Sequence, residues 1–88
     1  MLVRYFAAAR SASGVEEEHH HLADGVTMSE LLTAILAVDR PETPAGTPPL
    51  ARIITRSSFL RNEVAVRDLG LSLAAEDVID VLPPFAGG

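Results

Sequence analysis

Hydrophobic residues at helical spacing predict one main helix near the middle of the chain. The apolar positions are Leu31, Leu32, Ile35 and Leu36. Their spacing places them on one face, which should pack against other elements. Thr27 is suited to cap the amino end, and Glu30, three residues later, completes a capping box. We therefore expect a helix over about residues 27–38 that ends before Pro41.

The other apolar residues fall in short runs that are typical of β-strands. The runs cover residues 2–8, 15–22, 57–61, 64–67 and 78–82. Turn-forming residues follow the first run at 9–14 and separate the third run from the fourth at Asn62-Glu63. We expect two hairpins on either side of the helix and a separate last strand.

A proline-rich segment links the main helix to the later strands. Four of the six prolines lie within residues 41–49, which we expect to form a loop too short to separate two domains. Pro49 is suited to open a short second helix, with Leu50, Ile53 and Ile54 on one side.

This order of elements predicts an α+β fold. If the first and last strands pair in the middle of one mixed sheet of about five strands, the main helix covers one face, which is a β-grasp arrangement. We expect one domain, with residues 1–82 as its folded part and residues 83–88 as a C-terminal tail. The apolar content of 48% can supply its core.

Composition excludes several functional classes. The net charge is −5, and the seven basic residues are scattered arginines, so no basic stripe for nucleic acid forms. The absence of cysteine excludes a disulfide framework, a thiolate zinc site and a cysteine nucleophile. No run approaches the roughly 20 apolar residues of a membrane span. Residues 1–6 resemble a strand rather than a signal peptide, and we expect a cytoplasmic protein.

The charged and histidine-rich residues 16–21 carry little functional signal. His19 and His21 would share one face of a strand, but no carboxylate or cysteine pattern completes a metal site. We therefore expect exposed strand residues and no bound metal. The run Glu16–Glu18 is interpreted as a solvated face.

The last six residues carry the clearest chemical signal. Pro83 and Pro84 end the last strand, because proline cannot donate to a sheet, and should act as a stiff spacer. Gly87 and Gly88 lack side chains, so the tail is thin enough to enter a narrow channel. The only reactive group left is the α-carboxylate of Gly88. These residues indicate a carrier that works through its C-terminus and, without cysteine, could hold sulfur only there.

Three segments resemble the MoaD/ThiS sulfur-carrier family. Residues 78–88 are similar to its C-terminus, an apolar strand followed by Pro-Pro, an apolar residue, a small residue and Gly-Gly. Residues 3–10 resemble its first strand, which runs into Phe-Ala and then Arg, and residues 58–63 resemble its central hairpin. Within the family, the likeness is strongest to the small subunits of molybdopterin synthase. The loop 41–49 is longer than in compact members, and the three histidines are not a family feature.

The resemblance implies a ubiquitin-like β-grasp fold and a sulfur carrier that is not an enzyme on its own. A ubiquitin-activating-enzyme-like adenylyltransferase would use ATP to adenylate Gly88, and a sulfur donor protein would convert it to a thiocarboxylate. As the non-catalytic small subunit of a heterotetrameric molybdopterin synthase, the chain would insert its tail into the large subunit. There it would donate sulfur to cyclic pyranopterin monophosphate in molybdenum cofactor biosynthesis, with no cofactor bound to the chain itself.

The resemblance also implies a docking surface near the tail. It supports Phe6 and Leu82, because the family binds the large subunit through apolar residues of the sheet face beside the tail. The full set of candidate partner-binding residues is Phe6, Phe59, Leu60, Leu82, Pro83, Pro84, Phe85 and Ala86. A core position is the alternative for each of them, least so for Phe85, which lies beyond the two prolines.

Other functions stay open from the sequence. A carrier for thiazole or cysteine synthesis would use the tail identically, although thiazole carriers are usually shorter and lack Pro-Pro. A ubiquitin-like modifier would attach its C-terminus to lysines of target proteins. The chain itself lacks lysine, which excludes only lysine-linked chains of itself. A β-grasp interaction module with an incidental Gly-Gly is the weakest alternative.

Overall fold

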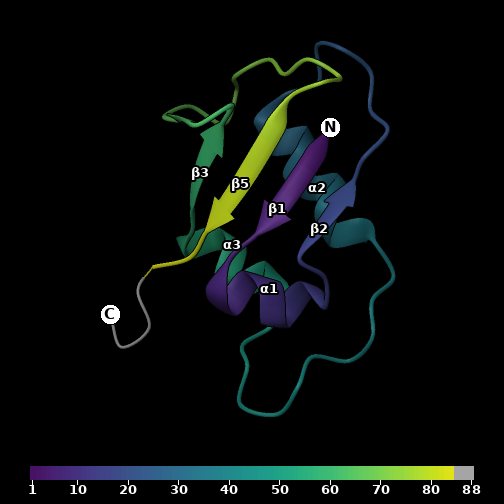
Figure 1. The fold of residues 1–88 in the computed structure, drawn as a ribbon, viewed down its shortest axis with the longest axis vertical. Helices are drawn as coiled ribbons and strands as arrows, with labels where there is room; N and C mark the ends of the chain where they lie inside the picture. The colour runs from purple at the N-terminus through teal and green to yellow at the C-terminus, as the bar shows by residue number, and fades with distance from the viewer. Residues whose placement is uncertain (85–88) are drawn as a thin grey trace.

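The computed structural model describes residues 1–84, in which five strands and three helices are found (Figure 1). In chain order they are β1 (Leu2–Tyr5), α1 (Ala7–Ser13), β2 (Glu17–His19), α2 (Met28–Ala37), α3 (Leu50–Arg56), β3 (Ser58–Arg61), β4 (Val64–Ala65) and β5 (Val78–Leu82). None of the helices within this part of the chain is long and apolar enough to cross a membrane.

All five strands form one sheet, with the first and last strands side by side near its middle. The order is β2-β1-β5-β3-β4, and β1 runs parallel to β5 while the other neighbouring pairs are antiparallel. Leu2 pairs with Val78, and Tyr5 pairs with Val81. The predicted mixed five-stranded sheet and the central pairing of the outermost strands in sequence are confirmed. This is the β-grasp arrangement.

The helices cover one face of the sheet, and the core lies between them and the sheet (Figure 1). Side chains alternate along a strand, so Val3 of β1 and Ile79 of β5 point to the same side, where both are fully buried. Met28, Leu31 and Ile35 of α2 meet them and are also fully buried. Each such side chain contributes about 2 kcal/mol by leaving water.

The main helix begins as the sequence predicts. The Thr27 hydroxyl accepts a hydrogen bond from the Glu30 amide (3.1 Å), and the Glu30 carboxylate accepts one from the Thr27 amide (2.9 Å). This capping box satisfies two amides that the first helical turn leaves free. Leu36 was expected on the packed face but is 44% exposed, because it lies at the margin of the apolar stripe in the last turn.

The structure corrects the prediction for residues 6–14. The strand ends at Tyr5 rather than at residue 8, and α1 replaces the expected turn. The segment is rich in alanine, which favours a helix, but it has no large apolar residues to show helical periodicity. Only small residues are buried along α1, namely Ala9, Ala12 and Ser13. The predicted short helix is confirmed as α3, with its three apolar residues buried.

Asn62 and Glu63 form the expected hairpin turn between β3 and β4. Both residues have positive φ, 47° and 71°, as in the tight turns that suit the twist of paired strands. The hairpin places β4 at one edge of the sheet.

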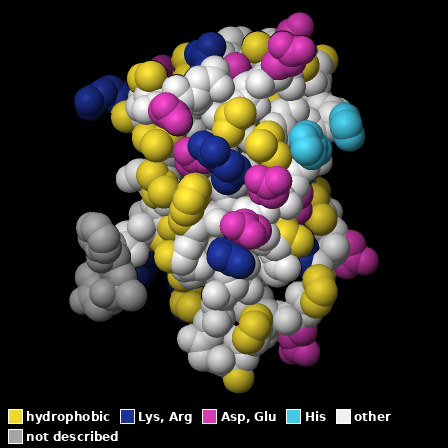
Figure 2. Space-filling model, viewed as in Figure 1, with side chains coloured by type: hydrophobic (Ala, Val, Ile, Leu, Met, Phe, Trp, Pro, Cys, Tyr) yellow, Lys and Arg dark blue, Asp and Glu magenta, His cyan; other side chains and the backbone are white. Residues whose placement is uncertain are grey.

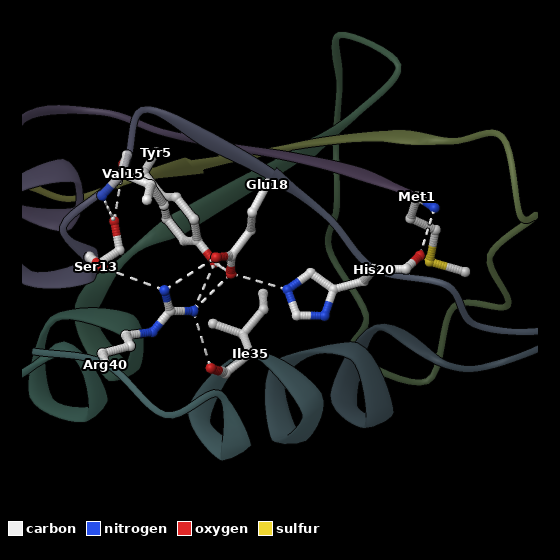
Figure 3. A network of polar contacts seen from close by, with 8 residues as sticks. All are labelled: Met1, Tyr5, Ser13, Val15, Glu18, His20, Ile35 and Arg40. Carbon is white, nitrogen blue, oxygen red and sulfur yellow. Dashed lines mark hydrogen bonds and ion pairs between the residues drawn. The ribbon is translucent and has the colours of Figure 1, made fainter.

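The structure also corrects the interpretation of Glu16–Glu18 as a solvated face. Glu18 lies opposite Val3 in the sheet register, so its side chain points to the helix-covered side. Its carboxylate accepts hydrogen bonds from Arg40 (2.6 and 3.0 Å) and from the Tyr5 hydroxyl (2.6 Å), and the His20 ring lies 2.9 Å away. Figure 3 shows the carboxylate enclosed by these three side chains.

Arg40 connects this network to the rest of the fold. Besides binding Glu18, its guanidinium donates to the carbonyl oxygens of Ser13 (3.2 Å) and Ile35 (3.1 Å). It therefore joins the start of the proline-rich loop to β2, α1 and α2. Burial alone raises the pKa of Glu18, but the hydrogen bonds from Arg40, Tyr5 and His20 outweigh it and lower this pKa to about 2.

Replacing Glu18→Gln should remove part of the loss of stability at acid pH. In the unfolded chain the carboxyl group takes up a proton near its ordinary pKa of 4.5, whereas in the folded chain it stays charged down to about pH 2. Its contribution is therefore complete above about pH 4.5 and is lost as the pH falls toward about 2.

Urea unfolding at about pH 6 and about pH 3 measures this effect, and the two midpoints should lie closer together in Glu18→Gln than in the wild type. The exposed neighbour variant Glu17→Gln serves as the control and should keep the wild-type difference. An equal difference in wild type and Glu18→Gln would contradict the role of this carboxylate.

Candidate functional site

The end of the sheet from which the chain leaves β5 is the candidate site, called here the exit end. Because β1 and β5 are parallel, both finish at this end, and the Phe6 amide donates to the Val81 carbonyl (3.3 Å). Leu82, the last residue of β5, pairs with Ser58 at the start of β3. Three segments far apart in sequence therefore meet where residue 83 departs from the sheet.

Among residues 1–84, Phe6 is a large apolar residue exposed at the exit end, with 42% of its surface accessible. It has an extended backbone, but the next residue, Ala7, has a φ of +49°, in the left-handed region that non-glycine residues seldom adopt. This reversal ends β1 and starts α1 within one residue. The chain thus accepts local backbone strain at the point where Phe6 reaches the surface.

The sheet face opposite the helices adjoins the exit end and is called here the open face. Arg4 of β1 and Leu60 of β3 both lie opposite Asp80 of β5, on this side of the sheet. The Arg4 guanidinium binds both oxygens of Asp80, at 2.6 and 2.9 Å. Figure 2 shows hydrophobic side chains among Arg, Asp and Glu side chains across this face.

Asp80 is only 5% exposed although it is charged, so its two bonds with Arg4 compensate for the burial of the carboxylate. The same hydrogen bond and charge raise the pKa of Arg4. An ion pair that lies beside an apolar side chain such as Leu60 suits a protein-binding face, because the charges can set the register of a partner while the apolar residue supplies contact area.

The structure brings part of the predicted partner-binding set together. Phe6, Leu60 and Leu82 lie at the exit end or on the open face, where the latter two are half-buried. Pro83 is half-buried and Pro84 is exposed as the chain leaves the sheet.

Phe59 does not share this surface. Alternation along β3 turns it to the helix side, where it is 7% exposed and belongs to the core. Phe59 therefore takes the core position that was the alternative to partner binding. Phe85, Ala86, Gly87 and Gly88 lie outside the described residues.

The ion pair between Arg4 and Asp80 on the open face is not among the features predicted from the sequence. A signal existed, because Arg4 interrupts one apolar strand and Asp80 interrupts the other, and the two strands were expected to pair. Opposite charges within neighbouring strands predict a cross-strand contact if the register is known. The register comes from the structure.

The histidines lie at β2, on the edge of the sheet. The His19 and His21 rings are stacked, with their centroids 6.5 Å apart and 15° between their planes. Within residues 1–84, no group of three or more His, Cys, Asp or Glu side chains is placed to hold a metal ion.

Comparison with known proteins gives a match over nearly the whole sequence. Residues 3–88 match the ThiS family. The chain is 31% identical over 87 residues to a molybdopterin synthase sulfur carrier subunit from Chlamydomonas reinhardtii. The aligned region covers 98% of this chain and 95% of that protein.

Solved structures share the fold. One is the complex of subunits 1 and 2 of the molybdopterin-converting factor from Helicobacter pylori, with a TM-score of 0.61, 25% identity, and coverage of 99% of this chain and 96% of that chain. Another is small archaeal modifier protein 1 from Haloferax volcanii, with a TM-score of 0.73, 22% identity and 97% coverage of both chains. The second likeness concerns the fold alone. Likenesses of this kind to solved structures identify the β-grasp as ubiquitin-like.

The same substitution at two adjacent alanines should have opposite effects on stability. Ala7→Gly relieves the left-handed strain and should raise the free energy of unfolding by about 1 kcal/mol. Ala8→Gly, at an exposed position within α1, should lower it by about 1 kcal/mol, because glycine is a poor helix former. Urea unfolding measures both, and a loss of stability in Ala7→Gly as large as that in Ala8→Gly would show that Ala7 is not strained.

Proposed function

The chain belongs to the ThiS family, and from this membership we propose that it is a sulfur carrier that serves as the small subunit of a molybdopterin synthase. The observation that carries the proposal is the 31% identity, over nearly the full length of the chain, to a molybdopterin synthase sulfur carrier subunit. The sequence Pro-Pro-Phe-Ala-Gly-Gly, which directly follows the central strand β5, supports it.

The proposed chemistry takes place on the carboxylate of Gly88. A carboxylate oxygen attacks the α-phosphorus of ATP on an adenylating enzyme, and pyrophosphate leaves. The terminal sulfur of a donor persulfide then attacks the acyl carbon, a C–S bond forms and AMP leaves. A second thiol attacks the donor sulfur of the resulting acyl disulfide and breaks its S–S bond, so that the thiocarboxylate leaves and the donor is left as a disulfide. Adenylation is needed because the negative charge of a free carboxylate resists nucleophilic attack, whereas AMP is a good leaving group.

In the second stage the thiocarboxylate sulfur attacks a carbon of cyclic pyranopterin monophosphate in the active site of the large subunit and displaces an oxygen substituent. Water then cleaves the acyl C–S bond, which leaves the sulfur on the pterin and restores the Gly88 carboxylate. The exit end suits this task, because a partner that binds the open face lies beside the point where the tail begins. At full extension, residues 83–88 reach at most about 20 Å beyond β5. Docking thus holds the sulfur close to its acceptor and raises its effective concentration.

Two further functions would use the same tail. Carriers for thiazole or cysteine synthesis differ in the protein that accepts the sulfur, so binding to a thiazole or cysteine synthase would favour them. A protein modifier would instead form an isopeptide bond between Gly88 and a target lysine. The fold likeness to an archaeal modifier is compatible with this role, but the 31% identity to a sulfur carrier favours sulfur transfer.

Incubation with ATP, the adenylating enzyme and a sulfur source should change the mass of the chain by the replacement of one oxygen with sulfur. Intact-mass spectrometry measures this change. A variant that lacks Gly88 should fold normally but gain no sulfur, because the carboxylate no longer reaches the active site of the adenylating enzyme. Sulfur gained equally by the truncated variant would rule out Gly88 as the site.

Phe6→Asp should weaken binding to the large subunit by about tenfold or more, because it places a charge at the proposed interface. Leu36→Asp on α2 is the matched control, since Leu36 is 44% exposed and Phe6 is 42% exposed, but Leu36 lies on the helix side. Isothermal titration calorimetry measures both affinities. Equal weakening by the two substitutions would contradict docking through the exit end.

A further inference from the structure

The chain contains neither a side-chain amine nor a thiol. All seven of its basic residues are arginine, and it has no cysteine. The guanidinium group of arginine stays protonated in proteins and, in that state, is not a nucleophile. Lysine and cysteine, the side chains that most readily attack an activated acyl group, are therefore missing from the whole sequence.

The remaining amine of the printed sequence is the nitrogen of Met1, which is buried. Met1 is 5% exposed, and its nitrogen donates a hydrogen bond to the His20 carbonyl at 2.7 Å. The His20 amide donates back to the Met1 carbonyl at 2.8 Å, so Met1 extends the ladder between β1 and β2. Figure 3 shows the Met1 nitrogen directed at the His20 carbonyl.

Hydroxyl and imidazole groups do not replace these nucleophiles. The Tyr5 hydroxyl is buried and donates to Glu18 (2.6 Å). Serine and threonine hydroxyls need an adjacent base to become reactive. Exposed imidazoles such as those of His19 and His21 can attack an acyl group, but the acyl-imidazole that forms is cleaved by water.

We infer that the folded chain presents no nucleophile able to form a lasting bond with an activated acyl group, its own adenylated Gly88 included. The part concerning Gly88 rests on the proposed function. In the reaction that is avoided, an amine nitrogen attacks the acyl carbon, a C–N bond forms, the C–O bond to AMP breaks, and a proton passes from nitrogen to water. The resulting amide would leave no free carboxylate at Gly88, so the chain could no longer act as a carrier.

This property directs the activated carboxyl group to nucleophiles that other molecules supply. For a sulfur carrier, it favours the sulfur donor over a second copy of the chain. For a protein modifier, it restricts attachment to single units. The chain thus achieves selectivity by lacking reactive side-chain amines and thiols and by burying the amine of Met1.

A chemical acylating reagent tests the surface without relying on Gly88. The folded full-length chain is treated with the N-hydroxysuccinimide ester of acetic acid and then with hydroxylamine, which removes acetyl groups from oxygen and imidazole. The folded wild type should keep no acetyl group, whereas Arg52→Lys, at an exposed position of α3, should keep one. In urea, the wild type should keep one acetyl group, on Met1.

Intact mass reports each outcome. A stable acetyl group on the folded wild type, at the rate found for Arg52→Lys, would overturn the inference. An unfolded wild type that stays unmodified would overturn the protective role assigned to the burial of Met1.

The enzymatic experiment uses the adenylating enzyme and ATP without a sulfur donor. The wild type should form no covalent adduct with itself, whereas Arg52→Lys and the exposed Arg56→Lys should yield cyclised or dimeric chains that have lost one water. Adducts in the wild type as abundant as in the variants would overturn the inference, as would their absence from the variants as well.

Added hydroxylamine separates the two proposals. It should trap the acyl-adenylate of the wild type as a hydroxamate, which shows that Gly88 has been activated. If no hydroxamate forms, the proposed function fails, while the acetylation experiment still decides the inference about the surface.

Discussion

The parallel pairing of β1 with β5 is the constraint on which the rest of the structure depends. It joins residues 2–5 to residues 78–82, nearly the full length of the chain apart. Because parallel strands finish at the same end, this pairing sets Phe6 beside Val81 and the start of the tail. It also supplies the buried side chains on which α2 packs. The exit end therefore exists only when both ends of the sequence have entered the sheet.

Two carboxylates on opposite faces of the sheet have different surroundings and different roles. Glu18, on the helix side, is held by Arg40, and Arg40 joins the start of the proline-rich loop to β2, α1 and α2. Asp80, on the open face, is held by Arg4 and leaves a pair of charges beside Leu60. The first pair secures the fold, whereas the second gives the open face a polar feature that a partner can recognise.

The sequence predicts those elements whose patterns are local. The periodicity and capping box of α2, the apolar run of β5 and the turn at Asn62-Glu63 all specify their structure within a few residues. It does not predict α1, because alanine and serine show no apolar period, or the Glu18 network, because its partner Arg40 lies 22 residues away. The position of Phe59 in the core likewise depends on the register of β3 against β5. The proposed chemistry of the tail depends on residue identity alone and can therefore be inferred from the sequence.

Tracing sulfur through a single turnover tests the central claim most directly. The chain is loaded at Gly88 with a heavy sulfur isotope and mixed with the large subunit and cyclic pyranopterin monophosphate, with no other sulfur source present. Our account predicts that the heavy isotope appears in the dithiolene of molybdopterin while the chain returns to its carboxylate mass. Product without the isotope, or a chain left joined to a lysine of the large subunit as the main outcome, would contradict it.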